Sequence, residues 1–132
     1  MAFTMSKTLN NGVEIPVLGL GVFESASATR DAVRFALETG YRHIDTAKFY
    51  GNEQDVFQGI VDSNIPRKEV FVTTKIWNDD MRAHNQREVI EQSIENLGGD
   101  YIDMLLIHWP VKDVFVETWK ICLLYTSPSP RD

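Results

Sequence analysis

The chain of 132 residues has a single cysteine and no long apolar run. Because Cys122 has no second cysteine to pair with inside the chain, a reducing compartment is expected. No stretch approaches the ~20 apolar residues that a membrane helix needs. Residues 1–14 also lack the apolar segment of a secretory signal. These absences predict a cytoplasmic protein that does not enter a membrane.

Lysine and arginine are scarce as well, with 13 of them against 19 aspartates and glutamates and a net charge of −6. No dense basic patch occurs, which argues against a nucleic-acid partner. With 43% hydrophobic and 24% charged residues, the composition is typical of one ordinary globular domain and not of a disordered chain.

Strand-like and helix-like segments alternate along the chain. Asn11–Gly12 predicts a two-residue hairpin turn near the N-terminus. Residues 17–23 follow as a predicted buried strand, and residues 104–109 are apolar enough for a strand buried on both faces. The remaining expected features are strands at 41–46 and 70–77, helices beginning after Asn52 and Asn85 as N-caps, a helix at 29–39, and another beginning near Val114.

This alternation predicts βαβ units around a parallel sheet, either a doubly wound open sheet or a (β/α)8 barrel. A doubly wound dinucleotide-binding domain would carry G-x-G-x-x-G after its first strand. The chain reads LGLGVFE at that point, without the third glycine. The sequence therefore disfavours that alternative.

Reactive side chains stand at the carboxyl ends of three successive predicted strands. Asp45, Lys75 and His108 occupy these ends, and Tyr50 lies in the loop after the first of them. In a parallel sheet these ends share one edge, where barrel enzymes build their active sites. Any one of these residues alone would more often be structural. Together they predict a site.

The four side chains suit protonation of an oxygen atom. A phenol such as that of Tyr50 holds its proton up to about pH 10. At ~4 Å and an effective dielectric constant of about 20, an ammonium stabilises the phenolate by about 4 kcal/mol. Lys75 would make Tyr50 a usable acid, Asp45 would keep Lys75 charged, and His108 would orient a carbonyl oxygen. A hydride must then come from a cofactor.

These residues lie in segments that resemble the aldo-keto reductases, especially bacterial-type reductases of small dicarbonyls or keto-sugars. The segments read GYRHIDTAKFYGNE, TTKIW and LLIHWP, and the opening LNNGVEIPVLGLGVF is similar too. The likeness runs from Thr8 to Lys120. It implies a (β/α)8 barrel, of which this chain holds an N-terminal hairpin and the first four βα units. It also implies reduction of aldehydes and ketones with NADPH, with NADH as the alternative cofactor.

The resemblance assigns roles to individual residues. It identifies Asp45, Tyr50, Lys75 and His108 as the catalytic tetrad, with Tyr50 as proton donor. The cofactor site would include Gly21, Val22, Phe23 and Asp45. The substrate pocket would be lined by Phe23, Phe49, Trp77, His108 and Trp109. His43 is expected to pack, His84 and Lys48 to face solvent, and no metal is expected.

The chain also departs from the family. Phe57 stands on a helix where the family usually has a small residue. Residues 1–121 are expected to form the N-terminal half of the barrel, and residues 122–132 a tail unlike the family, either disordered or an artefact of the reading frame.

Such a fragment would have little activity alone, since the family's adenosine and 2′-phosphate contacts come mainly from the other half. The full-length form would be a monomer. The alternative is a cofactor-binding regulatory subunit or another non-catalytic relative.

Overall fold

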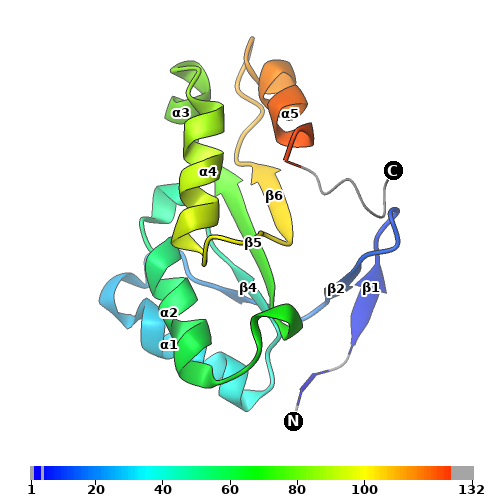
Figure 1. Cartoon of the computed structure of the whole chain (residues 1–132), viewed down its shortest axis with the longest axis vertical. Coiled ribbons are helices and arrows are strands. Elements are labelled where there is room, and N and C mark those ends of the chain that lie inside the picture. The colour runs from blue at the N-terminus through cyan, green and yellow to red at the C-terminus, as the bar shows by residue number, and fades with distance from the viewer. Residues whose placement is uncertain (1, 4, 126–132) are drawn as a thin grey trace.

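The computed structural model describes residues 2–3 and 5–125 of the chain. Its strands form two sheets (Figure 1). An antiparallel hairpin of β1 (Ser6–Thr8) and β2 (Glu14–Pro16) precedes a parallel sheet in the order β3-β4-β5-β6. The four parallel strands are β3 (Leu20–Gly21), β4 (His43–Asp45), β5 (Phe71–Ile76) and β6 (Met104–Ile107).

Helices follow each strand of the parallel sheet. They are α1 (Thr29–Thr39), α2 (Glu53–Ser63), α3 (Asn78–Arg82), α4 (Gln86–Asn96) and α5 (Phe115–Leu123), with short 3-10 turns η1 (Ala26–Ala28), η2 (Lys48–Tyr50) and η3 (Arg67–Glu69). In Figure 1, α1, α2 and α4 lie on one side of the sheet. The predicted α/β class, parallel sheet and N-terminal hairpin are confirmed. That the four strands are half of a closed barrel stays a prediction.

The hairpin turn is one residue longer than predicted. The Leu9 amide donates to the Val13 carbonyl over 2.8 Å, so the loop contains three residues. Gly12 has φ of 86°, the left-handed conformation that ends a three-residue hairpin loop and that glycine adopts without strain.

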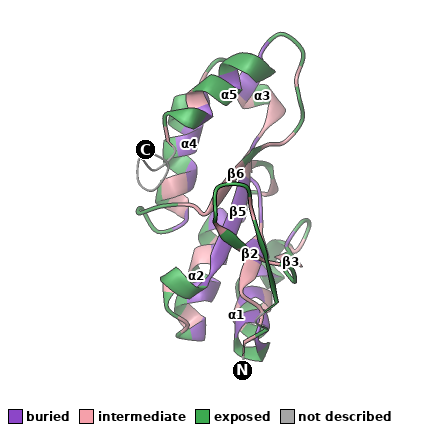
Figure 2. Ribbon diagram, turned by 90° about the vertical axis from the view of Figure 1, so that its right-hand side faces the viewer, coloured by how far each residue is buried: buried purple, intermediate pink, exposed green. Residues whose placement is uncertain are grey.

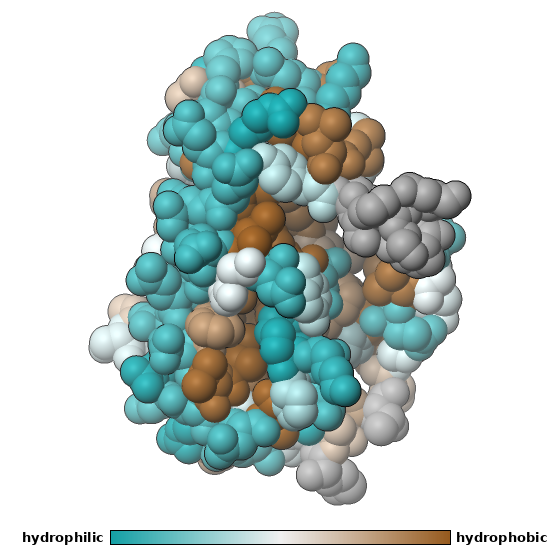
Figure 3. All heavy atoms as spheres, in the orientation of Figure 1, coloured by the Kyte–Doolittle hydropathy of each residue, from teal (hydrophilic) through white to brown (hydrophobic). Residues whose placement is uncertain are grey.

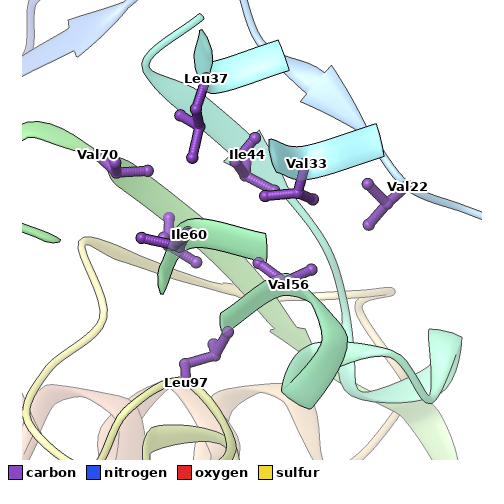
Figure 4. Close-up of a cluster of buried hydrophobic side chains, with 9 residues drawn as sticks. Val22, Val33, Leu37, Ile44, Val56, Ile60, Val70 and Leu97 are labelled. Atoms are coloured by element: carbon purple, nitrogen blue, oxygen red, sulfur yellow. The ribbon is translucent and has the colours of Figure 1, made fainter. Parts of the chain in front are cut away.

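The main hydrophobic core lies between the parallel sheet and its first two connecting helices. Ile44 and Val72 from the sheet meet Val33, Leu37 and other apolar side chains of the two helices (Figure 4). Helices α1 and α2 approach closely at Gly59, where an added Cβ would lie 2.6 Å from the Arg30 carbonyl oxygen. This close approach fixes α2, the helix that follows Tyr50.

Two strand predictions were wrong in extent. The strand expected over residues 17–23 is paired only at Leu20–Gly21, and Val17 instead continues the hairpin by donating to the Met5 carbonyl. β6 is not buried on both faces, because it is the last strand of the described sheet: Leu105 and Ile107 pack against α4 and α5, whereas Leu106 is 39% exposed. Figure 2 shows the strongest burial along β5.

The two predicted N-caps occupy the expected positions but do not cap. Neither Asn52 nor Asn85 makes a side-chain hydrogen bond to its helix, and the Asn85 Oδ1 atom is buried without a partner in the described part of the chain. Asn52 uses its amide for contacts with other segments, which tertiary packing decides and local sequence does not reveal.

Phe57, the departure from the family pattern, packs beside the glycine pair after α4: a Cβ on Gly98 would lie 2.7 Å from its ring. Helix α5 runs to Leu123 and buries Cys122, and several of its exposed side chains are apolar (Figure 3). Burial raises the pKa of the Cys122 thiol to about 11. Of the predicted tail, residues 126–132 lie outside the described residues.

Candidate active site

The four predicted catalytic side chains come together at the carboxyl end of the parallel sheet. Asp45 is the last residue of β4, Lys75 is near the end of β5, and His108 directly follows β6. Tyr50 ends the turn η2, in the loop that leaves β4. The chain folds this way because adjacent parallel strands bring their ends to one edge.

Lys75 is the centre of the hydrogen bonding. Its Nζ atom lies 2.9 Å from Asp45 Oδ2, 2.9 Å from the Thr46 carbonyl oxygen and 3.4 Å from the Tyr50 hydroxyl. The Lys75 side chain is only 14% exposed, against 37% for Asp45. The ammonium therefore has three oxygen partners and little water, which favours a fixed position.

Tyr50 lies between two other rings as well as beside the ammonium. Its ring centroid is 5.0 Å from that of Phe23 and 6.0 Å from that of His108, the second at 83° in an edge-on arrangement. These contacts leave its hydroxyl directed to the same region as Lys75 Nζ.

His108 is held by its neighbours but leaves part of its ring free. Its backbone amide donates to the Ile76 carbonyl over 3.1 Å, and its ring meets that of Trp77 edge-on at 5.0 Å. The Nδ1 atom is buried without a hydrogen-bond partner among the described residues. Burial, and then the charge of Lys75, lower the pKa of His108, which favours a neutral ring at pH 7 with one N–H to donate.

The predicted pocket aromatics divide into two groups. Phe49 and Trp77 stack at 3.9 Å, and Trp77 contacts His108, so this pair borders the site. Trp109 is 60% exposed and, within residues 5–125, has no ring contact with these aromatics. Ring contacts therefore link Phe23, Phe49 and Trp77 to Tyr50 and His108, whereas Trp109 follows His108 in the chain with its own ring exposed.

The three residues predicted at the nicotinamide end differ in orientation. Gly21 pairs with Asp45 across the sheet, and a Cβ on it would meet nothing within 4 Å, so there is open space beside the tetrad. Phe23 is 57% exposed. Val22 is only 1% exposed, and its N–H and C=O both bond within the protein, to Asp45 and to Asn52 and Ser25. Val22 therefore lies behind the site and does not face it.

In the described part of the chain, His43, His84 and Lys48 form no hydrogen bond with the four predicted catalytic side chains. His43 lies 2.9 Å from Thr73 Oγ1 on the inner face of the sheet, and burial is the main cause of its lowered pKa. His84 is exposed and lies 2.8 Å from Glu117 Oε2, and Lys48 is half-buried in η2. Across residues 2–3 and 5–125, no three His, Cys, Asp or Glu side chains are grouped to hold a metal ion.

Two buried polar residues near the site were not foreseen. Asn52 and Glu53 are 4% and 3% exposed and contact the ends of the strands that carry the tetrad. The available signal was the pair Thr73–Thr74 inside a buried strand, since a hydroxyl on the helix-facing side requires a buried partner.

Two further surfaces are distinct from this site. A cavity of about 700 Å³ lies between the hairpin, the start of β6, α4 and α5, and none of the predicted site residues lines it. No helix in the described part of the chain combines the length and apolar character that crossing a bilayer requires.

The chain is similar to known proteins over most of its length. Residues 17–123 match the model of the aldo/keto reductase family. Over 115 residues the chain is 54% identical to 9,11-endoperoxide prostaglandin H2 reductase of Trypanosoma cruzi, covering 86% of this chain and 41% of the relative. It is 46% identical over 114 residues to glyoxal reductase of Bacillus subtilis, covering 85% and 41%.

Solved structures of aldo-keto reductases are similar to this chain as well. A crystal structure of an aldo/keto reductase from Brucella melitensis superposes with a TM-score of 0.85 at 44% identity, over 91% of this chain and 48% of that one. The aldo-keto reductase of Bombyx mori in complex with NADP superposes with a TM-score of 0.78 at 39% identity, over 90% and 45%. The chain thus spans less than half the length of these relatives.

Proposed function

The chain belongs to the aldo/keto reductase family, which uses NADPH, and we propose that it carries the proton-donating part of a site that reduces small aldehydes and ketones to alcohols. The observation that supports this most is the position of Lys75 Nζ, within 3.4 Å of the Tyr50 hydroxyl and 2.9 Å of Asp45. The assignment of Asp45, Tyr50, Lys75 and His108 as the catalytic tetrad is part of this proposal.

In the proposed reaction, the Tyr50 hydroxyl donates its proton to the substrate's carbonyl oxygen as negative charge develops there. The Lys75 ammonium stabilises the phenolate that remains, because the two groups are 3.4 Å apart. Asp45 and the Thr46 carbonyl oxygen keep the ammonium in place and compensate its charge. The neutral ring of His108 donates one hydrogen bond to the same substrate oxygen and so orients the carbonyl.

NADPH supplies the hydride when it is bound. Gly21, Phe23 and Asp45 would hold its nicotinamide end, since the space beside Gly21 is open and the ring of Phe23 is exposed. Phe49 and Trp77 would enclose the substrate on the other side of Tyr50. One relative, 46% identical, is named glyoxal reductase, and another, 47% identical, is named morphine 6-dehydrogenase; we favour a small dicarbonyl such as glyoxal as the substrate.

We infer that this chain builds the reductase site only in part. The inner face of β6 is open, since Leu106 is 39% exposed, and the relatives are more than twice as long as the matched segment. We therefore propose that the 132-residue chain turns over slowly by itself and binds NADPH weakly. We also infer that the protein is cytoplasmic, because Cys122 has no second cysteine in the chain to pair with, and that its full-length form is a monomer, as the resemblance implies.

The Tyr50→Phe variant tests the proton-donor role, with glyoxal as substrate. We expect NADPH to change the tryptophan fluorescence of the unmutated chain and of the variant alike, because Trp77 borders the site. Turnover is expected to fall at least ~100-fold in the variant. Tyr101→Phe is the matched control, since Tyr101 is exposed and contacts Arg67 through its ring face, away from the site.

Equal turnover in the Tyr50→Phe and Tyr101→Phe variants would contradict the assignment of Tyr50 as proton donor. Binding of NADPH without measurable turnover in the unmutated chain would instead support a cofactor-binding, non-catalytic protein. The two outcomes separate the enzyme from that alternative.

A further inference from the structure

The start of α2 holds two adjacent polar side chains that are almost fully buried. Asn52 is 4% exposed and Glu53 is 3% exposed, and they follow Tyr50 after only Gly51. Neither caps the helix through its side chain. Both side chains instead reach across to other elements, in different directions.

Glu53 joins the start of α2 to β5 and to α4. Its Oε2 atom accepts a hydrogen bond from Thr74 Oγ1 at 2.6 Å, and its Oε1 atom accepts from Ser93 Oγ and Asn96 Nδ2 at 3.1 Å each. Thr74 is fully buried on the helix side of β5, and the next residue of that strand is Lys75. The Glu53 carboxylate is therefore hydrogen-bonded to the residue that precedes Lys75, on the opposite face of β5.

Asn52 joins the same helix start to the ends of β3 and β4. Its Oδ1 atom accepts from Thr46 Oγ1 at 2.6 Å, and its Nδ2 atom donates to the Val22 carbonyl oxygen at 2.9 Å. The Thr46 carbonyl oxygen is one of the three partners of Lys75 Nζ, and Val22 precedes Phe23. The side-chain amide of Asn52 is thus hydrogen-bonded to the segments that carry a partner of Lys75 and Phe23.

The Glu53 carboxylate is held by hydrogen bonds and not by an ion pair in the described part of the chain. Within the described residues, no Lys or Arg forms an ion pair with Glu53, although its carboxylate is buried. A buried charge without a cation costs stability, and a neutral side chain of similar size would fill the space at lower cost. What the carboxylate provides is three strong, directional hydrogen bonds from two elements at once.

We propose that Glu53, assisted by Asn52, is a positioning residue that sets the distance between the Tyr50 hydroxyl and Lys75 Nζ. The proposal rests on the proposed function of Tyr50 as proton donor. On one face of β5 Lys75 meets Tyr50 at 3.4 Å, and on the other face Thr74 meets Glu53 at 2.6 Å. Since Tyr50 and Glu53 are three residues apart, displacement of the helix start from Thr74 displaces Tyr50 from Lys75.

Two variants remove one hydrogen bond each from the same carboxylate. Thr74→Val breaks the bond to the strand of Lys75 and keeps a β-branched shape, whereas Ser93→Ala breaks a bond to α4 only. We expect Thr74→Val to shift the ring resonances of ¹³C-labelled Tyr50, assigned by their loss in Tyr50→Phe. With NADPH and glyoxal it should lower kcat about tenfold, with KM changed less than about twofold. Ser93→Ala should lower the urea midpoint similarly and leave the Tyr50 resonances and kcat unchanged.

A conservative variant completes the test. Thr74→Ser keeps the hydroxyl and is expected to restore both the Tyr50 resonances and kcat. If Thr74→Val fails to fold, Thr46→Val, which removes the bond to Asn52 from the residue that follows β4, is expected to give the same shift and the same loss of kcat.

Equal effects of Thr74→Val and Ser93→Ala on Tyr50 would overturn the proposal, and so would an unmoved Tyr50 in Thr74→Val. Absence of turnover in the unmutated chain would count against the proposed function alone, because the resonance comparison still decides the positioning role.

Discussion

The ion pair of Lys75 and Asp45 offers the sharpest test of the site geometry. Lys75→Met removes the ammonium and keeps most of the side-chain length. The change abolishes the hydrogen bonds to Asp45 Oδ2 and to the Thr46 carbonyl oxygen, each 2.9 Å long. It leaves a carboxylate and a carbonyl group that only water can satisfy.

The expected size of the effect follows from distance and exposure. At 2.9 Å and an effective dielectric constant of about 20, the attraction between the two charges is at most about 6 kcal/mol. Asp45 is 37% exposed, so water regains much of this energy when Lys75 is removed, and we expect a net coupling of about 1–2 kcal/mol. The lost bond to the Thr46 carbonyl adds about 1 kcal/mol to the destabilisation by Lys75→Met.

A double-mutant cycle measures this coupling in urea unfolding. The cycle compares Asp45→Asn, Lys75→Met and the double variant, with far-ultraviolet circular dichroism as the signal. The exposed pair of Arg34 and Glu38, whose side chains are 38% and 45% exposed at 2.8 Å, is the matched control. We expect at most about 0.5 kcal/mol for this control pair, one helical turn apart.

A coupling at Lys75 and Asp45 no larger than that at Arg34 and Glu38 would refute the reasoning. It would mean that the ammonium is not fixed by the carboxylate in solution, and the proposed tuning of Tyr50 would lose its basis.

Two further predictions concern stability. Gly59→Ala should lower the free energy of unfolding by about 1–3 kcal/mol in thermal denaturation, because its Cβ would lie 2.6 Å from the Arg30 carbonyl oxygen and 2.7 Å from Val33 Cβ. Gln58→Ala, at an exposed position of the same helix, is the control. A free energy of unfolding that rises in Gly59→Ala, as it would in this control, would contradict the prediction. The free energy of unfolding should also fall as the pH decreases below about 6.5, because burial lowers the pKa of His43 and His108 and the unfolded chain therefore binds more protons. Urea midpoints at pH 7.5 and 5.5 test this. The midpoint should be lower at pH 5.5, and His108→Asn should reduce the difference between the two midpoints. Equal midpoints at the two pH values in the unmutated chain would show that neither ring is held neutral by folding.

The sequence predicted the parallel sheet and the convergence of the site because both depend on local periodicity. Strand and helix periods differ, so their alternation is visible residue by residue, and a parallel sheet then requires that Asp45, Lys75 and His108 share an edge. The same reasoning failed at both ends of the described sheet. An apolar run does not reveal whether a strand has a neighbour on each side, so residues 17–23 and 104–109 were predicted to be more buried than they are.

The buried bonds of Asn52 and Glu53 were missed for a related reason. Both residues follow the rule for helix starts, in which Asn caps and Glu favours the positive end of the helix. The structure satisfies them through residues 6 to 43 positions away in sequence, such as Thr46 and Asn96. A rule based on neighbouring residues cannot anticipate partners at that separation.

The position of these bonds follows from the alternation of side chains along β5. Successive residues of a strand point to opposite faces, so the pleat that directs Lys75 toward Tyr50 necessarily directs Thr74 toward the helices. A polar residue next to a catalytic residue on a strand can therefore form a hydrogen bond with a segment that packs on the opposite face of the sheet. In this chain that segment is the start of α2, which also carries Tyr50 three residues earlier. The proton donor and its tuning ammonium are thus linked on both faces of the same strand, which is why we expect their separation to respond to Thr74 and not to Ser93.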